Sequence, residues 1–273
     1  MSRVPFVKMH GAANDFVVVD HRQTFLPADP RELFRRLCDR RRGVGADGVL
    51  LLERDPELDF AMRYYNADGA AAEYCGNGAR CLARFALEHG LGHGGLVRFR
   101  SAAGVQEACR AAGNEIELHF GRVAPPGDAE TLDAVGRSFT GRRVRVGVPH
   151  FVTAVAAVGP VPVAVWGEAL RRHPRFAPAG TNVDFVARIG PGAVAMRTFE
   201  RGVEAETLAC GSGAIASALC VAQEGERSPV RILTAGGDAL VVSFAAVGSD
   251  LDVRLTGPAE VAFRGTWVEP AAS

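Results

Sequence analysis

The stretch from residue 75 to residue 81 reads Cys75-Gly76-Asn77-Gly78-Ala79-Arg80-Cys81 and carries the strongest structural signal in the chain. A second stretch repeats its plan about half a chain later and reads Cys210-Gly211-Ser212-Gly213-Ala214. Each has the pattern Cys-Gly-polar-Gly-Ala and opens an apolar run of helical length. One such motif would be a weak signal, but two indicate an internal repeat. We therefore expect two similar halves, each with a cysteine at the start of a helix.

Three further pairs of segments extend the repeat: 14–20 with 182–187, 97–104 with 230–237, and 116–121 with 251–257. The later pairs follow their cysteines at similar intervals and alternate apolar and polar residues as strands do. Each half thus reads strand, helix at the cysteine, turn, strand, strand. This order predicts an α/β (α+β) fold of two pseudo-symmetric halves.

Two helices are expected at the cysteines, over 76–88 ended by Gly90 and over 211–224 ended by Gly225. Both are apolar on nearly every side, so each should be buried inside a sheet that wraps around it. An earlier helix over about 30–41 should lie on the surface, since its apolar residues form one face: Leu33, Phe34, Leu37 and Cys38.

Composition narrows the function. The 273 residues, 48% of them hydrophobic, can build a substantial core, and 31 basic residues balance 31 acidic ones. No block of like charge suggests a nucleic-acid partner, and we interpret Arg40–Arg42 as a solvated helix end. No apolar stretch approaches the roughly 20 residues of a membrane span. Because Met1–Pro5 lacks the apolar core of a signal peptide, we expect a cytoplasmic protein.

The residue inventory also argues against cofactors. Six cysteines are too sparse for a disulfide scaffold, and none forms a CxxC pair, so no metal is expected. Lys8 is the only lysine and has no phosphate-binding motif beside it, which argues against pyridoxal phosphate. We interpret four cysteines as small core residues: Cys38, Cys81, Cys109 and Cys220.

Cys75 and Cys210 have a different context. A helix N-terminus favours a thiolate over a thiol, whose ordinary pKa is about 8.5. The neighbouring glycines let a ligand approach, and the amides of the first turn can hold its carboxylate. If both cysteines face one small substrate, they cannot both ionise cheaply. One would then act as base and the other as acid, as inversion at a carbon requires.

The sequence resembles the diaminopimelate epimerase family over nearly its whole length. The resemblance rests on motifs in the family's order: Lys8 to Phe16, Gly43 to Gly48, Tyr65 to Gly69, Cys75 to Cys81, Glu200 to Gly202, and Cys210 to Gly213. It implies two similar halves, each a curled, mostly antiparallel sheet around a central helix. We expect the halves at 1–122, completed by 262–273, and at 123–261, with the active site in the cleft between them.

The resemblance also implies roles for single residues. Cys75 and Cys210 would be the acid/base pair, supported by His150 and Glu200. The amides of Gly76-Asn77 and Gly211-Ser212 would hold the carboxylate at the reacting carbon. The remaining substrate contacts would come from Asn14, Asn66, Asn182, Glu200 and Arg201, with Arg201 on the distant carboxylate. Two positions depart from the family pattern: Val148 stands where many members have Asn, and Gly48 where some have Gln.

The resemblance thus implies a cofactor-independent isomerase that interconverts LL- and meso-2,6-diaminopimelate, a step toward lysine and peptidoglycan precursors. The partner would be this small amino acid, and a homodimer is compatible with the sequence. Three alternatives stay open. They are a racemase of another amino acid, a cysteine hydrolase that pairs Cys75 or Cys210 with His150, and a binding protein without catalysis.

Overall fold

The computed structural model describes residues 3–72 and 74–268. By the contacts between its residues the chain divides at His119/Phe120 and at Thr256/Gly257. Unit 2 is Phe120–Thr256, and unit 1 comprises the chain before and after it. Both divisions fall inside strands, β8 (Glu115–Val123) and β17 (Asp250–Pro258). Residues 269–273 of the expected completing segment, and Met1 and Ser2, lie outside the described residues.

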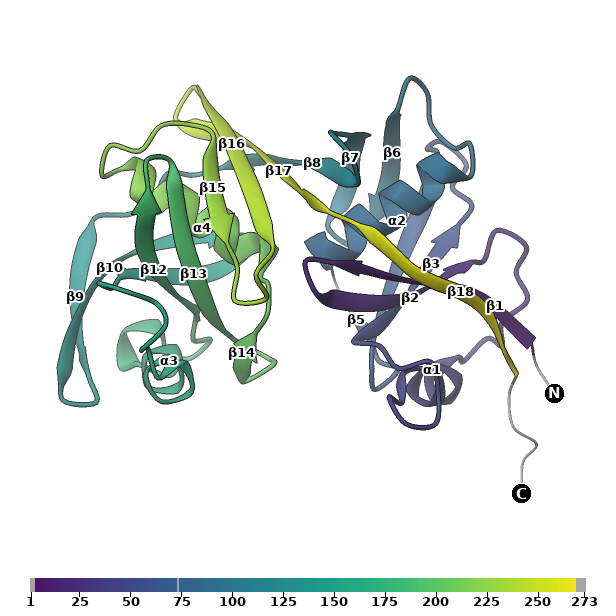
Figure 1. Cartoon of the computed structure of the whole chain (residues 1–273), viewed down its shortest axis with the longest axis horizontal. Coiled ribbons are helices and arrows are strands. Elements are labelled where there is room, and N and C mark those ends of the chain that lie inside the picture. The colour runs from purple at the N-terminus through teal and green to yellow at the C-terminus, as the bar shows by residue number, and fades with distance from the viewer. Residues whose placement is uncertain (1–2, 73, 269–273) are drawn as a thin grey trace. The chain divides into compact units, whose positions relative to one another are not determined.

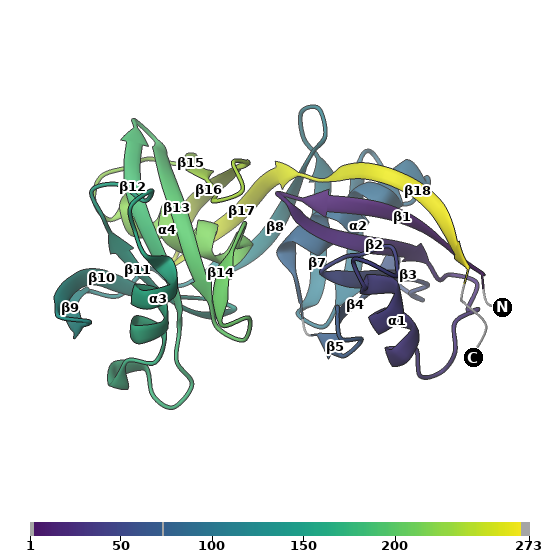
Figure 2. The same ribbon diagram turned by 60° about the horizontal axis from the view of Figure 1, so that its bottom comes forward.

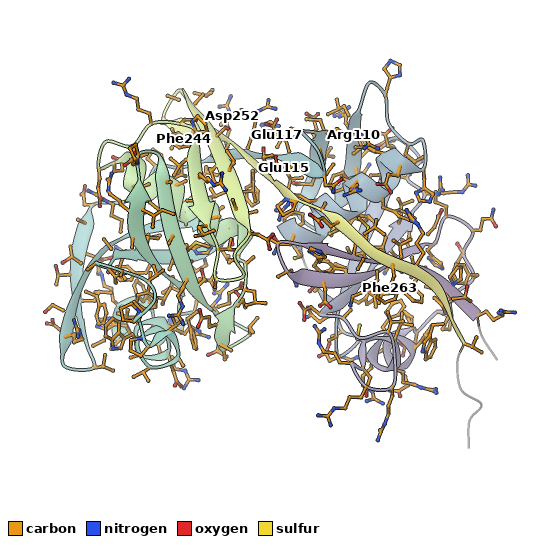
Figure 3. The ribbon with its side chains drawn as sticks, in the orientation of Figure 1. Arg110, Glu115, Glu117, Phe244, Asp252 and Phe263 are labelled. Carbon is orange, nitrogen blue, oxygen red and sulfur yellow. The ribbon has the colours of Figure 1, made fainter. Side chains whose placement is uncertain are left out.

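The sheet of unit 1 has the order β18-β1-β2-β3-β4-β6-β7-β8. Its further strands are β1 (Arg3–Gly11), β2 (Asn14–Asp20), β3 (Gly48–Glu53), β4 (Phe60–Asn66), β6 (Leu96–Ser101), β7 (Gly104–Arg110) and β18 (Glu260–Val268). Among the strands that the structure describes, β2–β3 and β4–β6 are the parallel pairs of this sheet, and the short β5 (Ala71–Ala72) adds to β4. In Figure 1 the yellow β18 lies along the purple β1, and Phe263 on β18, labelled in Figure 3, meets Phe6 edge-to-face.

Unit 2 repeats this plan in the order β9-β10-β11-β12-β13-β15-β16-β17. Its further strands are β9 (Ala129–Ala134), β10 (Arg137–Val146), β11 (Val148–Ala154), β12 (Asn182–Gly190), β13 (Ala193–Glu200), β15 (Val230–Leu233) and β16 (Ala239–Val247). Again two pairs are parallel, β11–β12 and β13–β15, and the short β14 (Ala205–Thr207) adds to β13. The predicted fold of two similar α/β halves is confirmed.

The topology corrects one part of the predicted repeat. By strand order β2 corresponds to β11 and β3 to β12, so the match of 14–20 with 182–187 is wrong. In each unit a helix lies in the chain between the two strands of the first parallel pair. This helix is α1 (Arg31–Cys38), between β2 and β3, in unit 1 and α3 (Val163–Arg171), between β11 and β12, in unit 2. The similar sequences of residues 14–20 and 182–187 therefore belong to strands at different positions in their sheets. The other two pairs match as predicted, since they fall on β6 with β15 and on β8 with β17.

The two cysteine helices fill the inside of their sheets. In unit 1, α2 (Gly76–Glu88) contacts strands β1 to β4, β6 and β7. In unit 2, α4 (Gly211–Ala222) contacts strands β10 to β13, β15 and β16. Gly90 and Gly225 follow them in the left-handed conformation that ends many helices, with φ of 73° and 103°. Burial of the apolar helices inside curled sheets is therefore confirmed.

The surface helix α1 is shorter than expected. Its four predicted apolar residues are buried, but the helix ends at Cys38 instead of about residue 41. The carboxylate of Asp39 accepts the backbone N–H groups of Arg41 and Arg42, each at 2.8 Å. This local turn competes with further helical hydrogen bonds and stops the helix.

The alternation of β-strand side chains prepares the site in unit 2. Val183 and Phe185 of β12 join an apolar cluster with α3, which lies against β12 and β13 (Figure 2). Because strand side chains alternate, Asn182 and Asp184 point to the opposite face, toward α4. Asp184 is fully buried there. A carboxylate on the inner face of a sheet is costly unless it is hydrogen-bonded, so Asp184 requires polar partners on this face.

Within the described residues, no helix is long and apolar enough to cross a membrane.

Candidate active site

Cys75 occupies the N-cap position of α2. Its backbone is extended, and its carbonyl accepts the first helical hydrogen bond from Ala79 N–H at 2.8 Å. Its Sγ lies 3.4 Å from Asn14 Oδ1, an acceptor, so the thiol donates this hydrogen bond. The sequence-predicted residues Cys75, Asn14 and Asn77 are thus brought together in unit 1.

Charged groups fix the orientation of the two amides around Cys75. Asn77 donates its Nδ2 to Asn14 Oδ1 at 3.2 Å and accepts from Arg80 Nη2 at 2.9 Å. Asn14 in turn donates its Nδ2 to Asp47 Oδ2 at 2.8 Å. A cation at one end and a carboxylate at the other therefore both direct the carbonyl oxygen of Asn14 toward the thiol.

Arg40 belongs to this network and is not simply a solvated helix end. Its guanidinium bridges Asp15 and Asp47, with contacts of 2.8 and 2.7 Å. Asp15 also pairs with the buried Lys8 at 2.6 Å. Burial raises the pKa of Asp15, but the hydrogen bonds from Arg40 and Lys8 outweigh it and hold that pKa well below its usual range. Sequence reasoning missed Asp47 and Arg80, because each looks like an ordinary turn or helix residue.

Two further positions that the sequence analysis singled out in unit 1, Asn66 and Gly48, lie outside the hydrogen-bond network of Cys75. Asn66 is exposed at the end of β4, where its backbone closes a turn with Gly69 and Ala70. At Gly48 an added Cβ would lie 2.4 Å from the carbonyl oxygen of Tyr65 and 2.6 Å from the Tyr64 ring. A glutamine at this position would therefore not fit this backbone, since the carbonyl oxygen of Tyr65 and the ring of Tyr64 occupy the space of its Cβ.

Cys210 is the N-cap residue of α4. Its carbonyl accepts from Ala214 N–H at 2.9 Å, and its Sγ accepts from Gly213 N–H at 3.3 Å. Sγ also lies 3.4 Å from Ser212 Oγ. Both cysteines thus stand where first-turn N–H groups lack intrahelical acceptors and can hold an anion.

A buried polar cluster surrounds Ser212. His150 places Nε2 3.0 Å from Ser212 Oγ and Nδ1 2.7 Å from Asp184 Oδ2. Thr198 Oγ1 donates to the other oxygen of Asp184 at 2.7 Å. Asn182 Nδ2 lies 3.3 Å from His150 Nε2. Sequence reasoning found His150, Asn182 and Ser212, but not Asp184, whose alternate position on β12 was the available signal.

The electrostatics of Cys210 differ from the prediction. Burial raises the pKa of this thiol well above its usual value, and the negative charges of Glu200 and Asp184 add to the effect. Hydrogen bonds from Ser212 and Gly213 lower it but do not prevail. Burial therefore opposes the effect of the helix N-terminus at Cys210, and which of the two cysteines is the thiolate stays a prediction. Burial also raises the pKa of Glu200, although Thr207 Oγ1 donates to its carboxylate.

Arg201 follows β13, and both its backbone and its side chain make hydrogen bonds. Its backbone N–H donates to Asn182 Oδ1 at 2.7 Å, and its Nη1 lies 3.4 Å from the carbonyl of Ala179. At Gly76, no described residue would come within 4 Å of an added Cβ, so ligand atoms have room at this end of α2. Among the described residues, no three His, Cys, Asp or Glu side chains are grouped to hold a metal ion.

Three of the other cysteines are core residues, as predicted. Cys38, Cys81 and Cys220 are buried. Burial raises the pKa of Cys38 and of Cys81 to about 12. Cys109 is half-buried on β7.

The fold of this chain is similar to those of several solved structures. A PhzF-family protein of Bacillus anthracis superposes with a TM-score of 0.70 at 12% identity, covering 98% of this chain and 100% of that one. A probable proline racemase of Agrobacterium radiobacter K84 gives 0.70 at 17% identity, covering 98% and 93%. The fold therefore belongs to a class that includes racemases and PhzF-family proteins.

Within this class, the chain belongs to the diaminopimelate epimerase family. The family's sequence profile, described as diaminopimelate epimerase, matches residues 6–124 and 142–261. The diaminopimelate epimerase of Aquifex aeolicus is 41% identical over 275 residues, covering 95% of this chain and 96% of the relative. That of Chlorobaculum tepidum is 38% identical, covering 94% and 99%. The predicted family, and with it the function of an epimerase, an isomerase, is confirmed.

Proposed function

We propose that this chain interconverts LL- and meso-2,6-diaminopimelate, with Cys75 and Cys210 as the two proton-transfer groups. One thiolate would remove the α-proton, and the thiol on the other side of the carbon would return one. The observation that carries this proposal is the equivalent placement of both sulfurs, each on the N-cap residue of the central helix of its unit. Closure of the two units on the substrate would bring both sulfurs to one carbon.

The helix ends support the ground and transition states of such a reaction. The amides of Gly76-Asn77 and Gly211-Ser212 would bind the carboxylate next to the reacting carbon. They would also stabilise the charge that develops there when the proton leaves. Because an α-proton is weakly acidic, the closed site would need to exclude water and fix the geometry. No cofactor is required for this chemistry.

The distal end of the substrate would be recognised by a second group of residues. Arg201 would pair with the distant carboxylate, and Glu200 would neutralise the distant ammonium. Asn14, Asn66 and Asn182 would add hydrogen bonds. Val148 cannot hydrogen-bond through its side chain, so recognition of the distal end would depend on the other residues of this group.

Deuterium incorporation tests the mechanism. Incubation of LL-diaminopimelate with the protein in D₂O, without cofactor, should yield meso product that carries deuterium at the inverted α-carbon. Cys75→Ala and Cys210→Ala should each abolish product formation, whereas Cys109→Ala, a thiol on β7, should not. Inversion that survives the loss of either sulfur would refute the two-cysteine mechanism.

Arg201 separates diaminopimelate from other amino-acid substrates. Arg201→Ala should weaken kcat/KM for diaminopimelate by about 10- to 100-fold, the worth of one charged hydrogen-bonded pair. Residual activity on a monocarboxylate such as lysine should not change. Arg172→Ala, at a largely exposed surface arginine, is the matched control. Equal loss for both substrates would favour a racemase of a different amino acid.

We further propose a cytoplasmic enzyme whose partner is this small amino acid, working alone or as a homodimer. Sedimentation of the purified chain at several concentrations tests the assembly.

A further inference from the structure

We propose that Arg171, the last residue of α3, is a positioning residue that holds Arg201 in place for the distant carboxylate of the substrate. This inference rests on the proposed function for its purpose, because that function assigns the carboxylate to Arg201. All of its contacts lie within unit 2. The side chain of Arg171 contacts both the turn that carries Arg201, after β13, and the loop that precedes β12.

The turn that carries Arg201 has an unfavourable backbone conformation. Residues 201–204 join β13 to β14, and the backbone N–H of Glu204 donates to the carbonyl of Glu200 at 2.8 Å. Two residues of the turn are left-handed, Gly202 with φ of 94° and Glu204 with φ of 57°. Glycine adopts this conformation freely, but the Cβ of a glutamate disfavours it. Other contacts of Glu204 must therefore offset this strain.

The side chain of Glu204 supplies these contacts, since three N–H groups converge on its Oε1. Within the turn, Gly202 N–H donates to Oε1 at 2.9 Å. From α3, Arg171 brings its Nε to 3.0 Å and its Nη2 to 2.9 Å from the same oxygen. The hydrogen bonds from Gly202 and Arg171 hold the pKa of this carboxyl below its usual value. Glu204 is therefore an anion at neutral pH, and its hydrogen bonds are charge-assisted.

Arg171 is better placed than its neighbour to support the turn. The side chain of Arg171 is only 17% exposed, and that of Glu204 is 35% exposed. Arg172 lies 3.6 Å from the other oxygen of Glu204, but its side chain is 63% exposed. Exposed ion pairs contribute little, because water screens the charges and the long side chains lose freedom. The support of the turn from α3 therefore comes mainly from Arg171.

Arg171 also packs against the loop on the other side of Arg201. Its guanidinium lies directly over Gly180, where an added Cβ would clash with Nη1. In this loop, the carbonyl of Ala179 lies 3.4 Å from Nη1 of Arg201. The loop leads into Asn182, whose side chain accepts the backbone N–H of Arg201 at 2.7 Å. One buried arginine thus holds both the turn that carries Arg201 and the loop that Arg201 contacts.

This arrangement would pre-organise the substrate-binding guanidinium. With Arg171 in place, Arg201 stays in one position before the ligand arrives. Without Arg171, the turn would loosen, and binding of the carboxylate would have to include the cost of ordering it. The reacting carbon lies at the other end of the substrate, so the loss should appear in substrate binding and hardly in the proton transfer.

Local proteolysis tests the support of the turn without any substrate. In the native full chain, trypsin should cleave after Arg201 about fivefold faster or more in Arg171→Ala than in the parent, as measured by peptide mass spectrometry. This substitution leaves the residues around the cleaved bond unchanged. Cleavage after Arg227, in the loop before β15, reports on general unfolding of unit 2 and should not change.

Arg175→Ala is the matched control for this measurement. It removes another arginine ion pair close to α3, with Glu130 at 2.8 Å, and should be cleaved after Arg201 at the rate of the parent. Equal rates after Arg201 in Arg171→Ala and the parent would overturn the proposal. An equal rise after Arg201 and after Arg227 would also overturn it, because the effect would then be general loosening of the unit.

Kinetics with diaminopimelate test whether Arg171 acts through Arg201. Arg171→Ala should raise KM about fivefold and leave kcat within about twofold of the parent. In the Arg201→Ala background the same change should have no further effect, since the guanidinium that it positions is gone. Losses that multiply in the double variant would refute the positioning role. If the parent does not act on diaminopimelate, the proposed function fails, and the proteolysis still decides whether Arg171 holds the turn.

Discussion

Replacing Gly213 by alanine should destabilise unit 2, although alanine is the better helix former. The added Cβ would lie 2.5 Å from Asp184 Oδ1, and ordinary contact requires at least 3.4 Å. Asp184 cannot move aside without loosening its 2.7 Å hydrogen bonds to His150 and Thr198. Gly78 occupies the equivalent position on α2, where the three atoms nearest to the added Cβ belong to the side chains of Leu50 and Phe16, the nearest at 3.0 Å.

Both substitutions gain the same free energy from the higher helix propensity of alanine. They differ in the cost of making room for the added methyl group. The gain is about 1 kcal/mol each. Hydrogen bonds to a charged group contribute about 1.5–3 kcal/mol each, so weakening two of them at Asp184 should cost about 3–5 kcal/mol. Gly213→Ala should therefore lose about 2–4 kcal/mol net, whereas Gly78→Ala should stay within about 1 kcal/mol of the parent because a leucine side chain can shift.

Urea unfolding of both variants and the parent measures this difference. Fluorescence and circular dichroism should be followed together, since a chain of two units need not unfold in one step. Gly213→Ala should unfold at lower urea than Gly78→Ala. If the two midpoints coincide, the carboxylate of Asp184 is not held as the structure shows, and the reasoning fails.

Further predictions concern the helix ends and their charges. Gly76→Ala should leave the unfolding midpoint unchanged but raise KM about tenfold, because its methyl group enters space that a substrate carboxylate needs. Glu200→Gln removes a negative charge that raises the pKa of Cys210; the thiolate absorbance near 240 nm should then appear at lower pH. Asp47→Ala frees the amide of Asn14 to turn over, so kcat should fall about tenfold in the epimerase assay, with little change in the unfolding midpoint.

The local elements could be predicted because their signals lie within a few residues. Helices α2 and α4 begin where expected, since a cysteine followed by small residues opens an apolar run. Gly90 and Gly225 mark their ends. The end of α1 was not predicted, because the side chain of the next residue, Asp39, accepts hydrogen bonds from two backbone N–H groups that would otherwise continue the helix.

The sequence predicts several site residues but not the contacts between them. Cys75, Cys210, His150 and Asn182 carry recognisable motifs. Asp184 does not, because a single carboxylate within an apolar strand shows its importance only when the strand alternation and the partner helix are known.

The amino-acid sequence is enough to predict two related halves, a buried helix in each that begins at a cysteine, and a family of epimerases. These follow from periodicity, repeats and motifs, which are properties of neighbouring residues. The strand pairing in the folded chain was needed to show that β11, and not β12, is the counterpart of β2. The folded chain was also needed to show that the pKa of Cys210 is raised. Burial and the fields of Glu200 and Asp184 produce that shift, and they come from strands that meet α4 only in the folded chain.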